Sequence, residues 1–141
     1  MGRALGLDVG TKTIGVAVSD PLGISVRPVC TLRRKGVRQD VERLAPIARE
    51  QEVETLVVGL PLELDGEEGR SARLARQVGD ALGEALGLAP VYVDERYSSV
   101  DAERVLVQAD FSRKKRKKVI DQAAAILILQ SWLEHGNWSQ T

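Results

Sequence analysis

The chain has 141 residues, of which 43% are hydrophobic and 28% charged, and its 20 basic and 20 acidic side chains give a formal net charge of zero. This length suits one domain, expected to span residues 1–141, and the neutral balance argues against a general electrostatic attraction to nucleic acid. One cysteine excludes an internal disulfide framework, one histidine argues against a His-rich zinc site, and no apolar stretch approaches the roughly 18 residues of a membrane span, so a cytoplasmic protein is expected.

Three strands are expected at the start of the chain. Residues 4–9 form a short apolar run that contains an acid near its end, and residues 14–19 alternate β-branched and small side chains. The turn at residues 10–13 is so short that these two strands must pair antiparallel. Residues 26–32 suggest a third strand, and Pro28 within it predicts an edge position, where a missing N–H is harmless.

The middle of the chain changes to helical spacing. Apolar residues recur along 37–51 with a helical period, and Pro46 should kink or break this helix. Residues 55–60 form a continuous aliphatic run that ends at a Gly-Leu-Pro exit, which is typical of a strand buried on both faces.

The second half of the chain continues the alternation of helices and strands. The expected elements are a helix at 71–86 ended by Gly87, a strand at 91–93, a helix capped by Ser98 or Ser99, and a last helix at 119–134 after a basic loop. The order predicts an α/β fold with a mixed five-stranded sheet, in which antiparallel strands are added to a parallel core flanked by helices. Ligands of such sheets gather beyond the carboxyl ends of the parallel strands.

Acidic residues follow that rule. Asp8 ends the first strand, Asp94 and Glu95 end the fifth, and Asp121 is expected in the first turn of the last helix, where the helix dipole favours an acid. Carboxylates brought together repel one another unless a cation neutralises them, and hard Mg²⁺ or Mn²⁺ prefers oxygen ligands. Two such ions about 4 Å apart can bind the attacking water and the leaving oxygen of a phosphodiester.

Each acid also has a simpler interpretation. Asp8 can start a turn, Asp94 and Glu95 can be charges at a helix start, and Asp121 can stabilise a helix N-terminus. The sequence pattern leaves these alternatives open for single residues, while the set of three acids favours a metal site.

Basic residues supply a candidate surface for phosphate. An uninterrupted run consists of Arg113, Lys114, Lys115, Arg116, Lys117 and Lys118. Such a run is often a solvated loop, but beside Asp121 it would give salt-sensitive contacts with a nucleic-acid backbone. Arg96 can bind phosphate or pair with an acid. The turn that contains Lys12 can hold phosphate through its backbone N–H groups, although it does not match the P-loop pattern.

Four motifs together resemble the YqgF family, whose members are described as Holliday-junction-resolvase-like proteins and pre-16S ribosomal RNA nucleases. They are LDVGTKTIGVA at 7–17, VGLPL at 58–62, DERYSS at 94–99 and VIDQAAA at 119–125. The resemblance covers almost the whole chain in matching order. It implies a ribonuclease-H-like fold and metal-dependent phosphodiester hydrolysis, with Asp8, Glu95 and Asp121 as the catalytic metal ligands. Threonine is frequent in similar proteins where this chain has Ser98-Ser99, but a hydroxyl group remains.

The hypothesis from the sequence is therefore an endonuclease that processes precursor 16S ribosomal RNA. Resolution of branched DNA is the alternative within the same chemistry, because phosphate contacts do not identify the sugar or the branching. A sugar-kinase-like phosphotransferase also opens with an Asp-x-Gly-Thr turn, but such enzymes normally need two domains of this kind. A non-catalytic RNA-binding factor in ribosome assembly is the third possibility. The sequence leaves the oligomeric state, monomer or homodimer, open.

Overall fold

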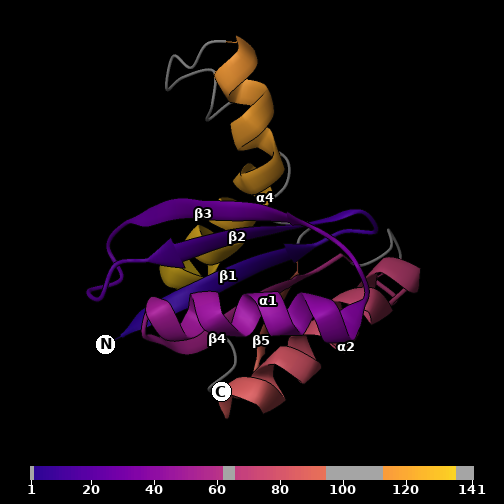
Figure 1. The fold of residues 1–141 in the computed structure, drawn as a ribbon. Helices are drawn as coiled ribbons and strands as arrows, with labels where there is room; N and C mark the ends of the chain where they lie inside the picture. Colours follow the sequence, from indigo (N-terminus) through magenta and orange to yellow (C-terminus); the bar gives the residue numbers. More distant parts are fainter. Residues whose placement is uncertain (1, 62–65, 95–112, 136–141) are drawn as a thin grey trace.

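The protein is described by a computed structural model that covers residues 2–61, 66–94 and 113–135, with side chains in the last stretch described for 123–134 only. A central sheet separates two helical layers (Figure 1). The helices α1 (Val37–Glu50) and α2 (Arg70–Leu86) cover one face, and α4 (Arg113–His135) packs against the other. That residues 1–141 form a single domain stays a prediction.

The sheet has the order β3-β2-β1-β4-β5. Its strands are β1 (Arg3–Val9), β2 (Thr13–Ser19), β3 (Val26–Arg33), β4 (Val53–Leu60) and β5 (Val91–Asp94). The pairs β1–β2 and β2–β3 are antiparallel, whereas β1–β4 and β4–β5 are parallel. The predicted mixed five-stranded sheet is therefore confirmed. The edge position predicted from Pro28 is also confirmed, since Pro28 lies in β3.

The ends of α1 and α2 agree with the predicted signals, but one prediction for the interior of α1 fails. Gly87 ends α2 in the left-handed conformation at φ 70°, which glycine adopts without a Cβ penalty. Of the two predicted effects of Pro46, the break was wrong, because α1 runs through this exposed residue as one helix, and the kink stays a prediction. The buried residues of α1, including Leu44 and Ala48, keep the helix against the sheet despite the missing N–H. None of the described helices is long and apolar enough to cross a membrane.

The last helix begins earlier than predicted. The basic run 113–118 forms its first turns instead of a loop, because arginine and lysine are good helix formers and no glycine or proline interrupts them. Position 121 therefore lies about two turns inside the helix, where the favourable charge of a helix N-terminus no longer acts. In Figure 1 the N-terminal half of α4 projects beyond the sheet and the C-terminal half lies behind it. The helix predicted after Ser98 falls outside the described residues.

The core is divided by the sheet into two apolar layers. On the side of α1 and α2, the layer includes Leu5, Leu7 and Val9 of β1. On the side of α4, the layer consists of Ala4, Ala17, Val57, Val93, Ala125, Ile128 and Leu129, with Val26, Ile126 and Trp132 packed against it. The second layer is rich in small residues, so α4 can approach the sheet closely. The alternation of side chains along β1 assigns residues 4, 6 and 8 to the α4 face.

β1 and α4 approach each other closely at Gly6. A Cβ atom added to Gly6 would lie 3.0 Å from Cβ of Leu129 and 3.1 Å from the carbonyl oxygen of Ala125. Backbone and a buried branched side chain cannot give way easily at such distances. This tight contact favours glycine at position 6 and marks where α4 crosses β1.

A Gly6→Val substitution should therefore destabilise the protein by about 1–3 kcal/mol through overpacking, as measured by urea unfolding. Gly2→Ala is the matched control, because its added Cβ would meet only the flexible side chain of Glu54, which can move away. An unchanged urea midpoint for Gly6→Val would contradict the tight crossing.

Candidate active site at the carboxyl edge of the sheet

Asp8 lies at the carboxyl end of the central strand β1. It pairs with Gly15 across the antiparallel hairpin, and its neighbours along β1, Leu7 and Val9, face the opposite apolar layer. Asp8 therefore faces α4, and it is half-buried. Its carboxylate has no hydrogen bond or ion pair with any described residue. A half-buried carboxylate without a protein partner is costly, and a bound cation would offset that cost.

The path of α4 brings position 121 toward the same end of β1. The helix crosses β1 at Gly6, which contacts Ala125 and Leu129. The C-terminal part of α4 lies beside the β2–β3 turn, where Gly23 and Leu133 line one pocket. That turn is at the amino end of β1, since the Ala4 N–H donates to Oγ of Ser19 at 2.9 Å. The helix therefore runs opposite to β1, and position 121 is one turn closer to the level of Asp8 than Ala125.

The fifth strand ends at the same edge. Asp94 is half-buried and pairs in register with Leu60, while Val93 pairs with Gly59. Strand β4 is parallel to β1, and β5 is parallel to β4. The carboxyl ends of these three strands therefore lie along one edge of the sheet. Glu95 and Arg96, the other predicted site residues of this motif, lie outside the described residues.

Tyr92 anchors β5 to helix α2. Its hydroxyl donates to Oδ1 of Asp80 at 2.6 Å and lies 3.2 Å from the Arg76 carbonyl oxygen. Burial and the adjacent Asp80 carboxylate raise the pKa of the Tyr92 phenol well above its ordinary value, so it remains a donor. The Arg76 guanidinium lies 4.6 Å from the centre of the Tyr92 ring and also pairs with Glu68. These contacts fix the strand that ends at Asp94.

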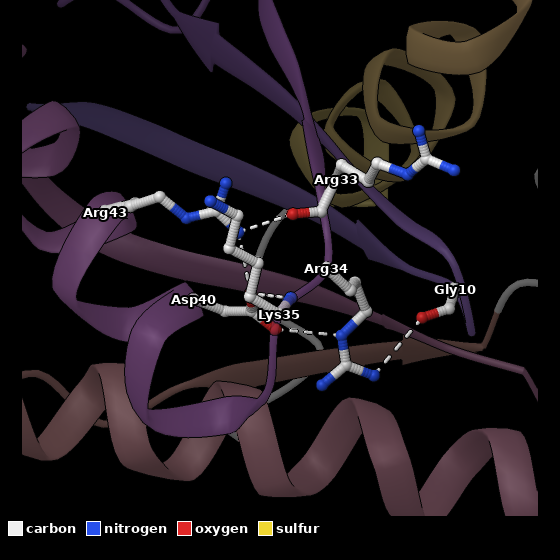
Figure 2. Close-up of polar contacts among 6 residues, drawn as sticks. All are labelled: Gly10, Arg33, Arg34, Lys35, Asp40 and Arg43. Carbon is white, nitrogen blue, oxygen red and sulfur yellow. Dashed lines mark hydrogen bonds and ion pairs between the residues drawn. The ribbon is translucent and has the colours of Figure 1, made fainter.

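The turn that follows Asp8 is connected, through Arg34, to the buried carboxylate of Asp40 in α1. The side chain of Asp40, in the first turn of α1, is fully buried and pairs with Nε of Arg34 at 2.9 Å and with a guanidinium nitrogen of Arg43 at 2.8 Å. It also accepts the Lys35 N–H at 2.9 Å. Arg34 in turn donates to the Gly10 carbonyl oxygen at 3.3 Å (Figure 2). We call Arg34, Lys35, Asp40 and Arg43 the Asp40 cluster.

The Asp40 cluster stabilises the ionised carboxylate. Burial alone would raise the pKa of Asp40, but the Lys35 N–H, the two guanidinium groups and the positive charge of Arg34 outweigh it and hold the pKa below its ordinary value of 3.8. The Lys12 carbonyl oxygen also accepts the Arg34 N–H at 2.8 Å. The cluster thereby ties the turn next to Asp8 to the start of α1.

The sequence analysis missed the Asp40 cluster. One signal was present, because Asp40 stands between Val37, Val41 and Leu44 on the side of the helix that was expected to be apolar. An acid at such a position is buried only when it has strong partners. Those partners come from the preceding strand end and turn, and their approach depends on the path of the chain.

The remaining predicted site residues are described in part. Lys12 is exposed in the β1–β2 turn. For Asp121 and the basic run 113–118 the structure describes the helical backbone alone. No three potential metal ligands lie together among the described side chains, and the side chains of the predicted ligands Glu95 and Asp121 are not among those described. The predicted metal site thus stays a prediction. The Asp8 carboxylate, which has no partner among the described residues, is consistent with it.

Replacing Asp40 by asparagine should destabilise the protein by about 3 kcal/mol at pH 7, because two buried guanidinium contacts lose their counter-charge. The lowered pKa of Asp40 means that its stabilisation is present above pH 4 and is lost as pH falls below that value. In urea unfolding from pH 7 to pH 3, the difference between wild type and Asp40→Asn should therefore narrow below about pH 4.

Glu42→Gln is the matched control for this experiment. It breaks the exposed Arg38–Glu42 pair in the same helix, which is worth at most about 1 kcal/mol. Equal unfolding free energies for the two variants would show that the contacts of Asp40 with Arg34, Lys35 and Arg43 do not stabilise the protein.

Comparison with known proteins relates this chain to nucleases. A family model described as "RuvX: Holliday junction resolvase" matches residues 2–135. A Myxococcus xanthus (strain DK1622) protein is 50% identical over 132 residues, which cover 94% of this chain and 87% of that protein. A Clostridium botulinum (strain Eklund 17B / Type B) protein is 46% identical and covers 94% of this chain and 96% of its own. Both carry the name "Putative pre-16S rRNA nuclease".

The fold has matches among solved structures as well. T. thermophilus RuvC in complex with a Holliday junction substrate superposes with a TM-score of 0.61 at 15% identity, covering 96% of this chain and 97% of that chain. At this identity the match supports the ribonuclease-H-like fold that was predicted. The family model and the relatives confirm the resemblance to the YqgF family and favour a nuclease over a phosphotransferase. The chain belongs to the RuvX family and is a nuclease.

Proposed function

We propose that this protein is a divalent-metal-dependent endonuclease that processes precursor 16S ribosomal RNA. The observation that carries the proposal is Asp8, a half-buried carboxylate without a partner among the described residues, at the carboxyl edge where the ends of β1, β4 and β5 meet. The names of relatives that are 45–50% identical support precursor ribosomal RNA as the substrate. Nucleic acid is the expected partner in either case.

The proposed site combines acids from three segments. Asp8, Glu95 and Asp121 are the ligands of Mg²⁺ or Mn²⁺, since carboxylate oxygens are the donors that these hard ions prefer. The bound metal would lower the pKa of a water and stabilise the charge of the cleaved phosphodiester. Asp8 is fixed by the antiparallel β2 and the parallel β4 on either side of β1, so the first ligand needs little reorganisation.

Basic residues would hold the substrate backbone. The run 113–118 occupies the first turns of α4, which project beyond the sheet (Figure 1). Positive side chains at a helix N-terminus oppose the helix dipole, so a polyanion that binds there relieves an unfavourable interaction. Lys12, in the turn after Asp8, and Arg96, next to Glu95 in sequence, are proposed to contact the phosphates nearest the cleaved bond.

Branched DNA is the second candidate substrate, and two observations favour it. The family model is described as a Holliday junction resolvase, and the superposed T. thermophilus RuvC was solved with such a junction. Phosphate contacts do not discriminate between the two substrates, so both belong in one assay. A non-catalytic role in ribosome assembly predicts RNA binding that is independent of metal and of Asp8.

Asp8→Asn should reduce cleavage of a precursor small-subunit RNA by at least about 100-fold, because one metal ligand loses its charge and several kcal/mol of transition-state stabilisation with it. The assay compares Mn²⁺, Mg²⁺ and chelator, with a four-way DNA junction as the second substrate. Glu54→Gln is the matched control, an exposed carboxylate near the opposite end of the sheet.

Three outcomes separate the hypotheses. Metal-dependent cleavage that is lost in Asp8→Asn and retained in Glu54→Gln supports the nuclease site. Cleavage of the DNA junction alone moves the substrate to branched DNA. Equal RNA binding by both variants without any cleavage contradicts the proposed nuclease activity and supports the assembly role.

The double variant Lys114→Gln/Lys115→Gln should bind RNA with a weaker salt dependence. The slope of log K against log salt should fall in magnitude by roughly 0.7–0.9 for each lysine that contacts a phosphate. Glutamine keeps the helix propensity of lysine. Arg70→Gln/Arg73→Gln removes two exposed charges from α2 on the other face and serves as control. Equal slopes for the two double variants would exclude the basic run as a phosphate contact.

A further inference from the structure

The end of β3 carries three consecutive basic residues, Arg33, Arg34 and Lys35, with different environments. Arg34 is turned toward Asp40 and is only 9% exposed in its side chain. Arg33 is exposed and directed away from Asp40 (Figure 2). Its guanidinium has no hydrogen bond or ion pair with any described residue. Arg34 therefore stabilises the fold, whereas the exposed guanidinium of Arg33 can bind a ligand.

Strand pairing assigns Arg33 to the same face of the sheet as Asp8. Asp8 is paired with Gly15, and Arg33 is paired with Thr13. Directly paired residues share a face, and so do residues two apart in one strand. Leu32, the preceding residue, packs in the opposite layer with α1 and α2, as this alternation requires.

The distance between the two residues suits successive contacts along one substrate strand. Arg33 is two strands from Asp8 and two residues farther toward the carboxyl edge, which gives roughly 12 Å between their Cα atoms. The arginine side chain shortens this gap. A phosphate near the cleaved bond is therefore within its reach when the substrate strand crosses β2 and β3.

The backbone that carries Arg33 is unusually well fixed. A guanidinium nitrogen of Arg43 donates to the Arg33 carbonyl oxygen while it also pairs with Asp40. The Arg34 N–H donates to the Lys12 carbonyl oxygen at 2.8 Å. The Asp40 cluster thus holds the backbone of both Arg33 and Lys12, whose charged ends remain free of partners among the described residues. A fixed backbone lowers the entropy cost of binding through these side chains.

We propose that Arg33 and Lys12 form a phosphate clamp, positioned by the Asp40 cluster, that binds the nucleic-acid backbone beside the cleaved bond on the α4 face. The clamp rests on the proposed nuclease function. It requires phosphodiester chemistry alone and makes no distinction between RNA and DNA. Arg33 and Lys12 act by holding the substrate strand, while Asp40 acts only through the residues that it positions.

The test compares Arg33→Gln with Arg38→Gln. Arg38 is an exposed arginine five residues later in α1, so both variants lose one surface charge from the same region. The probes are a 5′-extended precursor small-subunit RNA fragment and a four-way DNA junction, and binding is measured by fluorescence anisotropy at 50–200 mM salt (about the range over which phosphate contacts are resolved). An Asp8→Asn background prevents cleavage during these titrations.

Arg33→Gln should raise Kd about 5- to 10-fold and lower the magnitude of the salt slope by roughly 0.7–0.9, whereas Arg38→Gln should change neither. In proteins with intact Asp8, Arg33→Gln should raise KM and leave kcat within about twofold, as expected for uniform binding of ground and transition states. The double variant with Lys12→Gln should lower the slope by a further similar amount.

The outcomes distinguish the clamp from the nuclease proposal. Binding that is lost in Arg33→Gln although wild type cleaves neither probe supports the clamp and overturns the nuclease. Efficient cleavage by wild type, with Arg33→Gln indistinguishable from Arg38→Gln, overturns the clamp and leaves the nuclease intact. Equal losses in the two variants, or no binding by wild type, also overturn the clamp. Matching urea midpoints for the variants ensure that a loss of binding is not a loss of fold.

Discussion

The ion pairs of the buried Asp40 carboxylate connect the start of α1 to the end of β3 and to the turn after Asp8. Asp40 holds Arg34 and Arg43, and through them the carbonyl oxygens of Gly10 and Arg33. Burial of the charged Asp40 carboxylate is unfavourable unless it is paired. Removal of one partner would leave an uncompensated buried charge, so the contacts of the Asp40 cluster depend on one another. Its position bears on the proposed site, because the turn that it fixes begins two residues after Asp8 and the strand end that it fixes carries the exposed Arg33.

The α4 face is shaped by a second constraint, the close approach at Gly6. Small residues in β1, β2 and α4 allow the helix to lie near the sheet, and the contact of Gly6 with Ala125 and Leu129 sets where it crosses. The N-terminal half of α4, which begins with the basic run, projects beyond the sheet (Figure 1). In the proposed function, the basic run of α4 and the acids at the carboxyl edge of the sheet act on the same phosphate backbone.

The family match and the structure support different parts of the functional conclusion. The RuvX family model and relatives of 45–50% identity identify a nuclease. The geometry adds three local features: the Asp8 carboxylate has no partner among the described residues, Tyr92 anchors β5, and Arg34 is buried whereas its neighbour Arg33 is exposed. The metal and the substrate remain proposals with assays of their own.

The sequence by itself determined the sheet and the position of Asp8 near the carboxyl end of the first strand, because both depend on local patterns. The short turn after Asp8 forces an antiparallel pair, Pro28 requires an edge, and the aliphatic run before Pro61 predicts a buried strand, and the structure has all three features. The tertiary structure alone decided the start of α4 at Arg113, the continuity of α1 through Pro46 and the Asp40 cluster. Helix ends and kinks depend on packing energy that competes with weak local signals, and the partners of a buried charge are brought together by the path of the chain rather than by spacing in the sequence.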